Sequence, residues 1–216
     1  MRTRFHQFQK WILSTHGMWM SLILLLALAL SSLIFSVYTY KSWVSFQQDS
    51  KATEFTKMPT EALIKTNFGE IKIEFDPRSS LAVNQFVRLA KDGFYTGTRI
   101  HRIVPGFMIQ GGDPNSRNTS LIGEWGKGKA TNIIPDEIHA DDQMIAGTVA
   151  MVSDGTGHAS SQFFIVSHEA SWLNGHNTIF ARVVSGMDVV LQIEQIPTGV
   201  TGIPTQEVIL QSITIQ

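Results

Sequence analysis

The 216-residue sequence contains no cysteine. Disulfide bonds, thiolate nucleophiles and cysteine-ligated zinc are therefore excluded as sources of stability or chemistry. The missing cysteine does not identify the compartment, because a cysteine-free chain suits oxidising and reducing environments alike. The formal net charge is only −1, so no overall excess of positive charge indicates nucleic acid as a partner.

Charge is also missing locally, since no Asp, Glu, Lys or Arg occurs from residue 11 to residue 40. The most apolar part of this stretch, residues 19–38, would span about 30 Å as a helix, which is the thickness of a bilayer core. Aromatic side chains lie near its two ends, where membrane proteins concentrate them: Trp19 at one end, and Tyr38, Tyr40 and Trp43 at the other. The pattern predicts one transmembrane anchor helix over residues 19–40.

The flanking charges favour a cytoplasmic N-terminal segment, residues 1–18, because basic side chains precede the helix: Arg2, Arg4 and Lys10. The margin is small, because basic residues also follow it. In this orientation the protein is a single-pass membrane protein whose large domain lies outside the cytoplasm, in the periplasm if the host is bacterial. The polar residues 41–60 then form a tether between the helix and the domain, residues 61–216.

Three alternatives to an anchor remain open. A cleaved secretory signal could use Ala27-Leu28-Ala29 as its small-residue site and would give a secreted or periplasmic protein, but more apolar residues follow that site. An organelle transit peptide is compatible with the lack of acidic residues before Asp49, yet the stretch is too apolar to be typical of one. A buried helix of a soluble protein is disfavoured, because the stretch has no polar face.

Residues 61–216 show the pattern of a mainly β domain. Two short alternating runs, residues 62–66 and 70–75, flank the turn residues Asn67-Phe68-Gly69 and predict a β-hairpin. Apolar residues at helical spacing predict one helix between about residues 79 and 93 and a second near residues 187–193. Short strands, two helices and no internal repeat indicate a mostly antiparallel barrel or sandwich.

Three groups of residues suggest a hydrolase, a phosphate-binding loop or a metal site, but each lacks the spacing that such a site requires. Asp154, His158 and Ser160 resemble a hydrolase triad in type, but no nucleophile-elbow motif surrounds them. The segment 126–129 (GKGK) lacks the spacing of a P-loop and is interpreted as a basic surface loop. The acidic segment 135–142 matches neither a zinc helix motif nor a calcium loop. We therefore expect no metal and no cofactor.

The most unusual stretch runs from Arg99 to Asp113. It begins with strand-like alternation, turns at Pro105-Gly106, and continues as a second apolar run that ends in two glycines. A cation, an aromatic ring, a thioether and an amide lie close to this turn, a combination typical of a small-ligand pocket: Arg102, Phe107, Met108 and Gln110. Composition alone also allows a strand with an exposed arginine and ordinary core residues.

Residues 101–113 (HRIVPGFMIQGGD) resemble the signature of the cyclophilins, the peptidyl-prolyl cis-trans isomerases. The match is long and contiguous, and therefore more specific than a short motif. Residues 151–153, 161–165 and 172–175 are similar to later cyclophilin segments and follow in the same order. The resemblance covers residues 61–216 and implies a closed eight-stranded antiparallel β-barrel capped by two α-helices.

The resemblance also implies roles for individual residues. Arg102 matches the catalytic arginine, Phe107 lies in the proline pocket, and Gln110 matches the amide that holds the substrate backbone. The other matches to the pocket walls are Met108, Phe164 and Leu173. Trp172 matches the tryptophan associated with cyclosporin binding, and His101 is interpreted as structural support for the arginine beside it.

Two departures from the family pattern concern substrate binding. Asn177 stands where many members have a histidine, and it bears on substrate preference and rate more than on the reaction itself. Val152-Ser153 stands where many members have Ala-Asn, at a place where the family uses the backbone. The expected function is isomerisation of Xaa-Pro bonds in exported or membrane-proximal proteins. A proline-peptide binding or chaperone module with weak or no catalysis, and a purely structural membrane subunit, are the alternatives.

Overall fold

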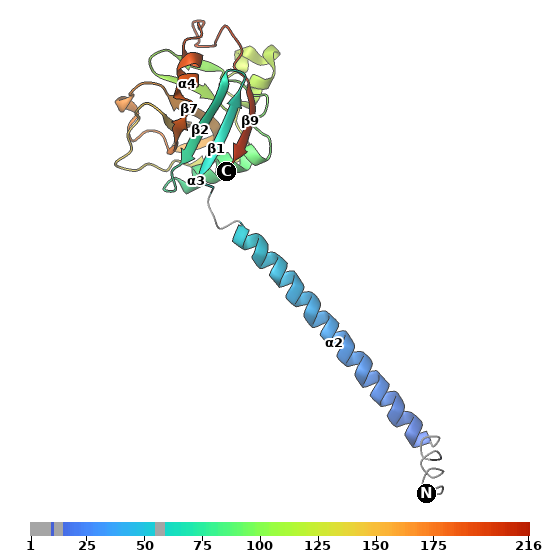
Figure 1. Cartoon of the computed structure of the whole chain (residues 1–216). Helices are drawn as coiled ribbons and strands as arrows, with labels where there is room; N and C mark the ends of the chain where they lie inside the picture. The colour runs from blue at the N-terminus through green and yellow to red at the C-terminus, as the bar shows by residue number, and fades with distance from the viewer. Residues whose placement is uncertain (1–9, 11–14, 55–58) are drawn as a thin grey trace. The chain divides into compact units, whose positions relative to one another are not determined.

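The computed structural model of the chain describes residue 10 and residues 15–54 and 59–216, with side chains described at residues 10, 18–43 and 59–216. The chain divides into two compact units, residues 1–57 and 58–216, which are treated separately below (Figure 1). Most of the predicted cytoplasmic segment, including Arg2 and Arg4, lies outside the described residues.

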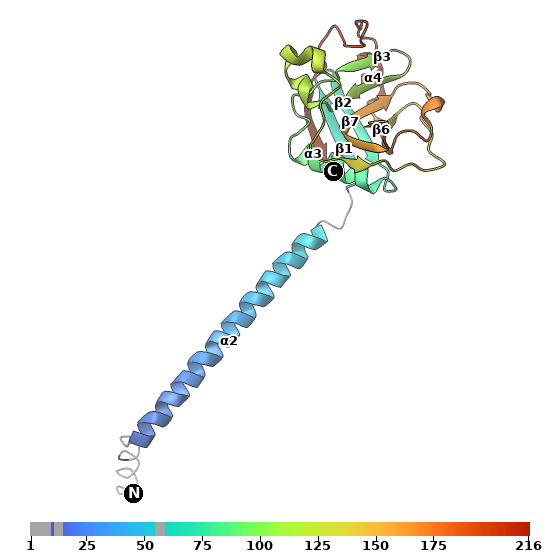
Figure 2. The same ribbon diagram turned by 180° about the vertical axis from the view of Figure 1, so that it is seen from behind.

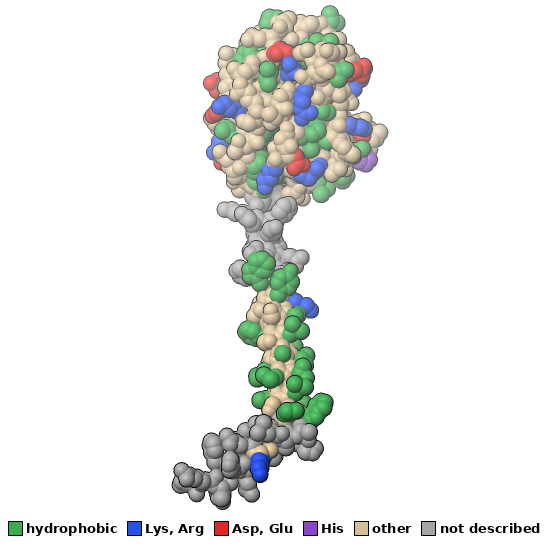
Figure 3. All heavy atoms as spheres, turned by 90° about the vertical axis from the view of Figure 1, so that its right-hand side faces the viewer, with side chains coloured by type: hydrophobic (Ala, Val, Ile, Leu, Met, Phe, Trp, Pro, Cys, Tyr) green, Lys and Arg blue, Asp and Glu red, His purple; other side chains and the backbone are tan. Residues whose placement is uncertain are grey.

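The first unit contains one long helix, α2 (Thr15–Glu54). Its residues 18–43 form a segment that is long and apolar enough to cross a membrane, and all their side chains are exposed within the chain. Figure 3 shows apolar side chains along this segment. The hydroxyls of Ser31 and Ser32 donate to the carbonyls of Leu28 and Ala29 at 2.8 Å, so these polar groups are satisfied within the helix. Residues 19–40 are helical, as predicted, and α2 continues to Glu54, into the residues predicted as a polar tether.

The second unit is built on one antiparallel sheet. Its neighbours run in the order β3-β4-β7-β6-β8-β2-β1-β9, and β5 pairs separately with β7. The strands are β1 (Glu61–Thr66), β2 (Gly69–Phe75), β3 (Arg102–Val104), β4 (Met108–Gly111), β5 (Ile134–Pro135), β6 (Thr148–Ser153), β7 (His158–Val166), β8 (Ile179–Ser185) and β9 (Leu210–Ile215).

Two helices cover the sheet, as predicted. Helix α3 (Ser80–Lys91) packs on β7, β8 and β9, and helix α4 (Met187–Glu194) packs on β2 and β4. Figures 1 and 2 show them at opposite ends of the domain. Three short 3-10 helices complete the described elements: η1 (Pro114–Arg117), η2 (Thr119–Glu124) and η3 (Ser171–Leu173).

The prediction of a fully closed barrel requires a correction, because the sheet is an open half-barrel with β3 and β9 at its two edges. Only a single bridge, between Arg99 and Ile209, and a few backbone bonds near it join the edges; the Gly97 amide donates to the Leu210 carbonyl at 2.8 Å. Strand β3 has three residues, and Gly97 before it has a φ of +77°, outside strand geometry. The edge is therefore too short and irregular to form a ladder.

Strands β4, β6 and β7 separate two apolar clusters by their alternation. One face contributes to the main core, in which the Phe86 ring lies 5.5 Å from Phe163 and 5.1 Å from both Tyr95 and Phe180. The opposite face forms a smaller cluster that includes Met108, Ala150, Phe164 and Val166. Figure 2 shows β6 and β7 beside one another. The smaller cluster forms the base of the candidate site.

Candidate active site

The hairpin of β3 and β4 brings the central polar side chains together. Arg102 and Gln110 are register partners across it, and the Arg102 Nη1 donates to the Gln110 Oε1 at 3.2 Å. The connecting turn contains Gly106 with a φ of +74°, a conformation that favours glycine. The Phe107 amide donates to the Val104 carbonyl at 3.0 Å and closes the turn. Local turn chemistry therefore positions both Arg102 and Phe107.

A cavity of about 200 Å³ lies beside this hairpin. One cation and one amide accompany apolar walls, which is the usual composition of a small-ligand site. Its lining residues are Arg102, Phe107, Met108, Gln110, Val152, Phe164 and Leu173. All seven are residues that the sequence predicts for the site, and the structure brings them into one cavity.

Gln110 is held by a second glutamine. The Gln110 Nε2 donates to the Gln162 Oε1 at 2.8 Å, and the Gln162 Nε2 donates to the carbonyls of Gly126 and Gly128 at 2.9 and 2.7 Å. This chain of bonds directs the Gln110 oxygen toward Arg102. The sequence does not mark Gln162 as a site residue; the available signal is a long polar side chain within the buried strand β7.

Arg102 has no acidic partner in the part of the chain that the structure describes, where every ion pair involves other residues. The Gln110 amide orients the guanidinium, but the amide is neutral and does not balance the positive charge. The side chain is exposed beside the cavity. The guanidinium can therefore donate hydrogen bonds to a molecule that enters the cavity.

Trp172 lies at the edge of the site. Its side chain is 61% exposed, and its ring centroid lies 5.4 Å from that of Phe107, which lines the cavity. The neighbouring Leu173, also in η3, reaches the lining itself. The two consecutive residues thus contribute an outer rim and an inner wall.

Asn177 and Ser153 are not among the residues that line this cavity. The Asn177 Nδ2 donates to the Met151 carbonyl at 3.1 Å, so its amide is bonded to β6. The Ser153 hydroxyl donates to the Asp136 Oδ2 at 2.6 Å, and Ser153 borders a second cavity. Both side chains therefore lie outside the lining of this cavity, and their predicted roles in substrate binding stay predictions.

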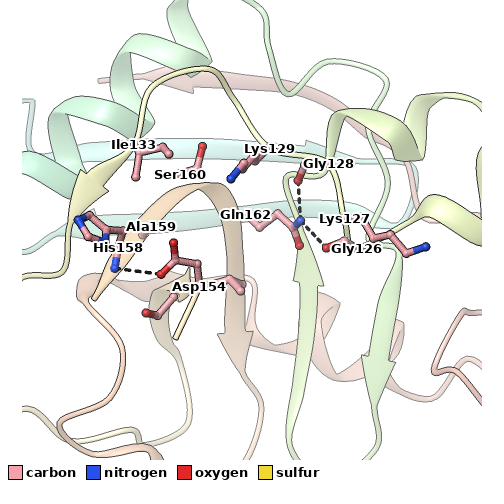
Figure 4. A pocket seen from close by; sticks show the side chains of 12 residues that line it. Gly126, Lys127, Gly128, Lys129, Ile133, Asp154, His158, Ala159, Ser160 and Gln162 are labelled. Atoms are coloured by element: carbon pink, nitrogen blue, oxygen red, sulfur yellow. Dashed lines mark hydrogen bonds between the residues drawn. The ribbon is translucent and has the colours of Figure 1, made fainter. Parts of the chain in front are cut away.

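The second cavity, of about 280 Å³, is shown in Figure 4 and shares Val152 with the first. Lys127 and Lys129 are among its lining residues. No hydrolase triad forms there, since the Ser160 hydroxyl donates to the Ala130 carbonyl at 2.9 Å. Asp154 accepts from the amide and the hydroxyl of Thr156, and these bonds hold the pKa of the Asp154 carboxyl below its ordinary value.

The acidic segment 135–142 is engaged in part by an arginine. Arg78 forms ion pairs with Asp76, Asp141 and Asp142 at 2.7, 2.9 and 3.2 Å. The hydrogen bond from Arg78 lowers the pKa of the Asp76 carboxyl. Across the described residues, no group of three or more His, Cys, Asp or Glu side chains could hold a metal ion.

His101, the residue before Arg102, is buried. Burial lowers the pKa of its imidazole, and the charge of Arg102 acts in the same direction, while Asp113 opposes the change. The neutral ring is therefore favoured in the folded protein. The role of His101 as structural support for Arg102 stays a prediction, because burial alone does not test it.

Comparison with known proteins identifies the family. The sequence profile described as cyclophilin type peptidyl-prolyl cis-trans isomerase/CLD matches residues 62–215. The chain belongs to this family.

Similar curated proteins fall into two groups by length. Peptidyl-prolyl cis-trans isomerase ppi1 of Schizosaccharomyces pombe is 37% identical over 148 residues, which are 66% of this chain and 90% of that protein. Peptidyl-prolyl cis-trans isomerase-like 1 of Mus musculus is 34% identical, over 71% of this chain and 90% of that protein. In contrast, the chain spans only about a third of peptidyl-prolyl cis-trans isomerase-like 2 of Rhizopus delemar, at 32% identity over 85% of this chain.

Among solved structures, a cyclophilin type peptidyl-prolyl cis-trans isomerase of Cryptosporidium parvum matches with a TM-score of 0.66 and 30% identity. The match covers 73% of this chain and 98% of that one. A second crystal structure of that protein, in the presence of the dipeptide Ala-Pro, matches with the same TM-score. That chain contains little besides this domain, so a cyclophilin domain folds on its own, and residues 58–216 form the corresponding compact unit here.

Proposed function

We propose that residues 58–216 catalyse cis-trans isomerisation of Xaa-Pro peptide bonds and that Arg102 is the catalytic residue. The observation that carries this proposal is the Arg102 guanidinium held by Gln110 at the side of a cavity whose other walls are apolar. Family membership supports the same reaction.

The reaction requires stabilisation of a twisted amide and no bond cleavage. Amide resonance opposes rotation by about 18–20 kcal/mol. The cis and trans forms of an Xaa-Pro bond are close in energy, yet they exchange slowly. A catalyst must therefore bind the twisted form more tightly than either planar form.

Arg102 supplies this selectivity. When the amide twists, the proline nitrogen recovers its lone pair and becomes an acceptor, to which the guanidinium donates. The same donor has little effect on a planar amide, so the stabilisation is specific to the transition state. The rings and side chains of Phe107, Met108, Phe164 and Leu173 hold the proline by apolar burial. Gln110 holds the adjacent backbone, so one side of the bond is fixed while the other rotates.

The test combines a rate with an affinity. The isolated domain, residues 58–216, is mixed with a short Xaa-Pro peptide, and both exchange rate and dissociation constant are measured. We expect faster exchange at domain concentrations that bind the peptide. Binding without acceleration by a folded domain would instead support a proline-peptide binding or chaperone module. Asn177, at a position where many family members have histidine, is the observation that favours this second candidate.

We also propose that α2 anchors the protein in a membrane with residues 1–18 in the cytoplasm and the domain outside it, where exported or membrane-proximal proteins are the substrates. The apolar segment 18–43 and the basic residues before it support this topology. In intact vesicles, protease should digest the domain only from the extracytoplasmic side. Digestion from the cytoplasmic side would reverse the orientation, and release of a shortened chain by alkaline carbonate would indicate a cleaved signal instead.

Trp172 provides a test of inhibitor binding. The exposed indole beside Phe107 is positioned to contact a bulky apolar ligand at the rim. We propose that cyclosporin binds there and inhibits the domain. Replacing Trp172→Ala should weaken inhibition by cyclosporin more than it lowers peptide turnover. Equal effects on both would contradict a specific role of Trp172 in cyclosporin binding.

A further inference from the structure

A buried carboxylate outside the cavity has no part in the reaction proposed above. Glu194 is the last residue of α4, and only 2% of it is exposed. Burial of a charge is costly, and the C-terminal end of a helix disfavours negative charge. A carboxylate in such a place requires hydrogen bonds that compensate for lost hydration.

Glu194 obtains these bonds from two segments that are distant in the sequence. Its Oε1 accepts from the Gly106 amide at 2.9 Å and from the Ser167 hydroxyl, and it lies 3.6 Å from the Nδ1 of the exposed His168. Gly106 belongs to the turn between β3 and β4. Ser167 directly follows β7 and begins the segment that leads to η3. One carboxylate oxygen therefore joins both segments.

Each segment carries a wall of the cavity. Phe107 follows Gly106 directly, and η3 contributes Leu173. A further bond ties the two segments together, since the Ser167 amide donates to the Phe107 carbonyl at 2.8 Å. The rings of Phe107 and Trp172, one from each segment, also contact each other. Glu194 is thus hydrogen-bonded to the two segments whose rings, Phe107 and Trp172, meet beside the cavity.

We propose that Glu194 is a positioning residue, which holds the Gly106 turn against Ser167 and so fixes Phe107 relative to η3. This inference rests on the proposed isomerase function and adds a residue that touches no substrate. The planar forms of the peptide can bind to a cavity whose walls relax. The twisted form needs walls at a fixed separation, so the spacing matters most in the transition state.

The test uses two substitutions at position 194 in the isolated domain. Glu194→Leu removes the acceptor and retains apolar packing, whereas Glu194→Gln retains a carbonyl oxygen that can accept both bonds. We expect the leucine variant to lose about tenfold in kcat while the dissociation constant for an Xaa-Pro peptide changes less than about threefold. The glutamine variant should recover kcat to within about threefold of the wild type.

Glu169→Gln is the matched control, because it removes an exposed carboxylate one residue from His168; it should leave both constants unchanged. Equal weakening of kcat and affinity by Glu194→Leu would indicate general loosening of the domain and would overturn the proposal, as would wild-type kcat in a folded variant.

If Glu194→Leu does not fold, the amide signals of Gly106 and Phe107 in Glu194→Gln decide the question. A shift of both signals that Glu169→Gln does not cause supports the positioning contact, and unshifted signals refute it. This measurement does not depend on turnover. A wild-type domain that fails to accelerate exchange would defeat the proposed function separately.

Discussion

The two faces of β4, β6 and β7 differ in what their side chains contact. On one face, Ile109, Phe163 and Ile165 are almost fully buried in the main apolar core. On the other face, Met108, Gln110 and Phe164 line the cavity. The same three strands therefore build the core and the site, and residues with adjacent numbers belong to different regions.

Stability and function therefore depend on alternate residues of the same strand. A side chain on the core face packs on all sides, so its loss leaves a cavity that the surroundings cannot fill. A side chain on the site face already borders an open cavity, so its loss mainly removes a contact with the ligand. Substitutions at adjacent positions should therefore affect different measurements.

The largest effect on stability is expected from Phe163→Ala. Its ring is buried against Phe86 and Tyr95, and truncation should lower the free energy of unfolding by about 3–5 kcal/mol. Urea denaturation followed by circular dichroism measures this change. A loss below about 1 kcal/mol would show that the core face is not the rigid region described here.

Phe164→Ala should lower activity and should destabilise the fold less than Phe163→Ala does. The ring forms a wall of the cavity, and its removal should lower kcat/KM by about tenfold through lost burial of the proline. Because the ring borders the cavity, the free energy of unfolding should fall by about 2 kcal/mol, less than for its neighbour. Equal losses of stability in the two alanine variants would remove the distinction between the faces.

The buried imidazole of His101 should make the free energy of unfolding depend on pH. The pKa of the buried His101 is lowered, so the unfolded chain takes up this proton near pH 6.5 and the folded domain only at lower pH. The stabilisation is therefore fully present above pH 6.5 and is lost as the pH falls from there toward the pKa of the folded state. Urea denaturation at several pH values should show this loss, and His101→Gln should reduce its slope. An unchanged slope in the variant would contradict the assignment to His101.

Asn177→His should have the smallest effect. Asn177 is bonded to the Met151 carbonyl and does not line the cavity, so the substitution is expected to change kcat/KM by about twofold to threefold. Exchange rates on peptides that differ in the residue before proline would measure both rate and preference. A tenfold gain would instead show that Asn177 limits catalysis.

Local patterns predicted the local elements. The hairpin of β1 and β2, helix α3 and helix α4 follow from alternation, helical spacing and turn residues within short stretches. The long extent of α2 did not follow, because the polar residues 41–54 carry no apolar periodicity that marks them as helix.

Long-range contacts produce the features that the sequence did not predict. The cavity residues were grouped through the resemblance to the cyclophilins, since periodicity alone does not bring β3, β7 and η3 together. The bond from Gln110 to Gln162 joins residues 52 positions apart, and that from Gly106 to Glu194 joins residues 88 positions apart. The open edge between β3 and β9 likewise depends on irregular backbone near Gly97. These features arise from tertiary packing and have no local signal.

Arg102→Ala is the decisive variant for the proposed role of the guanidinium. In the isolated domain, the exchange rate of an Xaa-Pro peptide is measured for the wild type, Arg102→Ala and Arg102→Lys, the last of which keeps the charge but not the guanidinium geometry. We predict that alanine lowers kcat/KM by about 100-fold or more, and that lysine recovers only part of it. The thermal midpoint should not change, because Arg102 is exposed. Wild-type turnover by a folded Arg102→Ala domain would contradict the proposed mechanism.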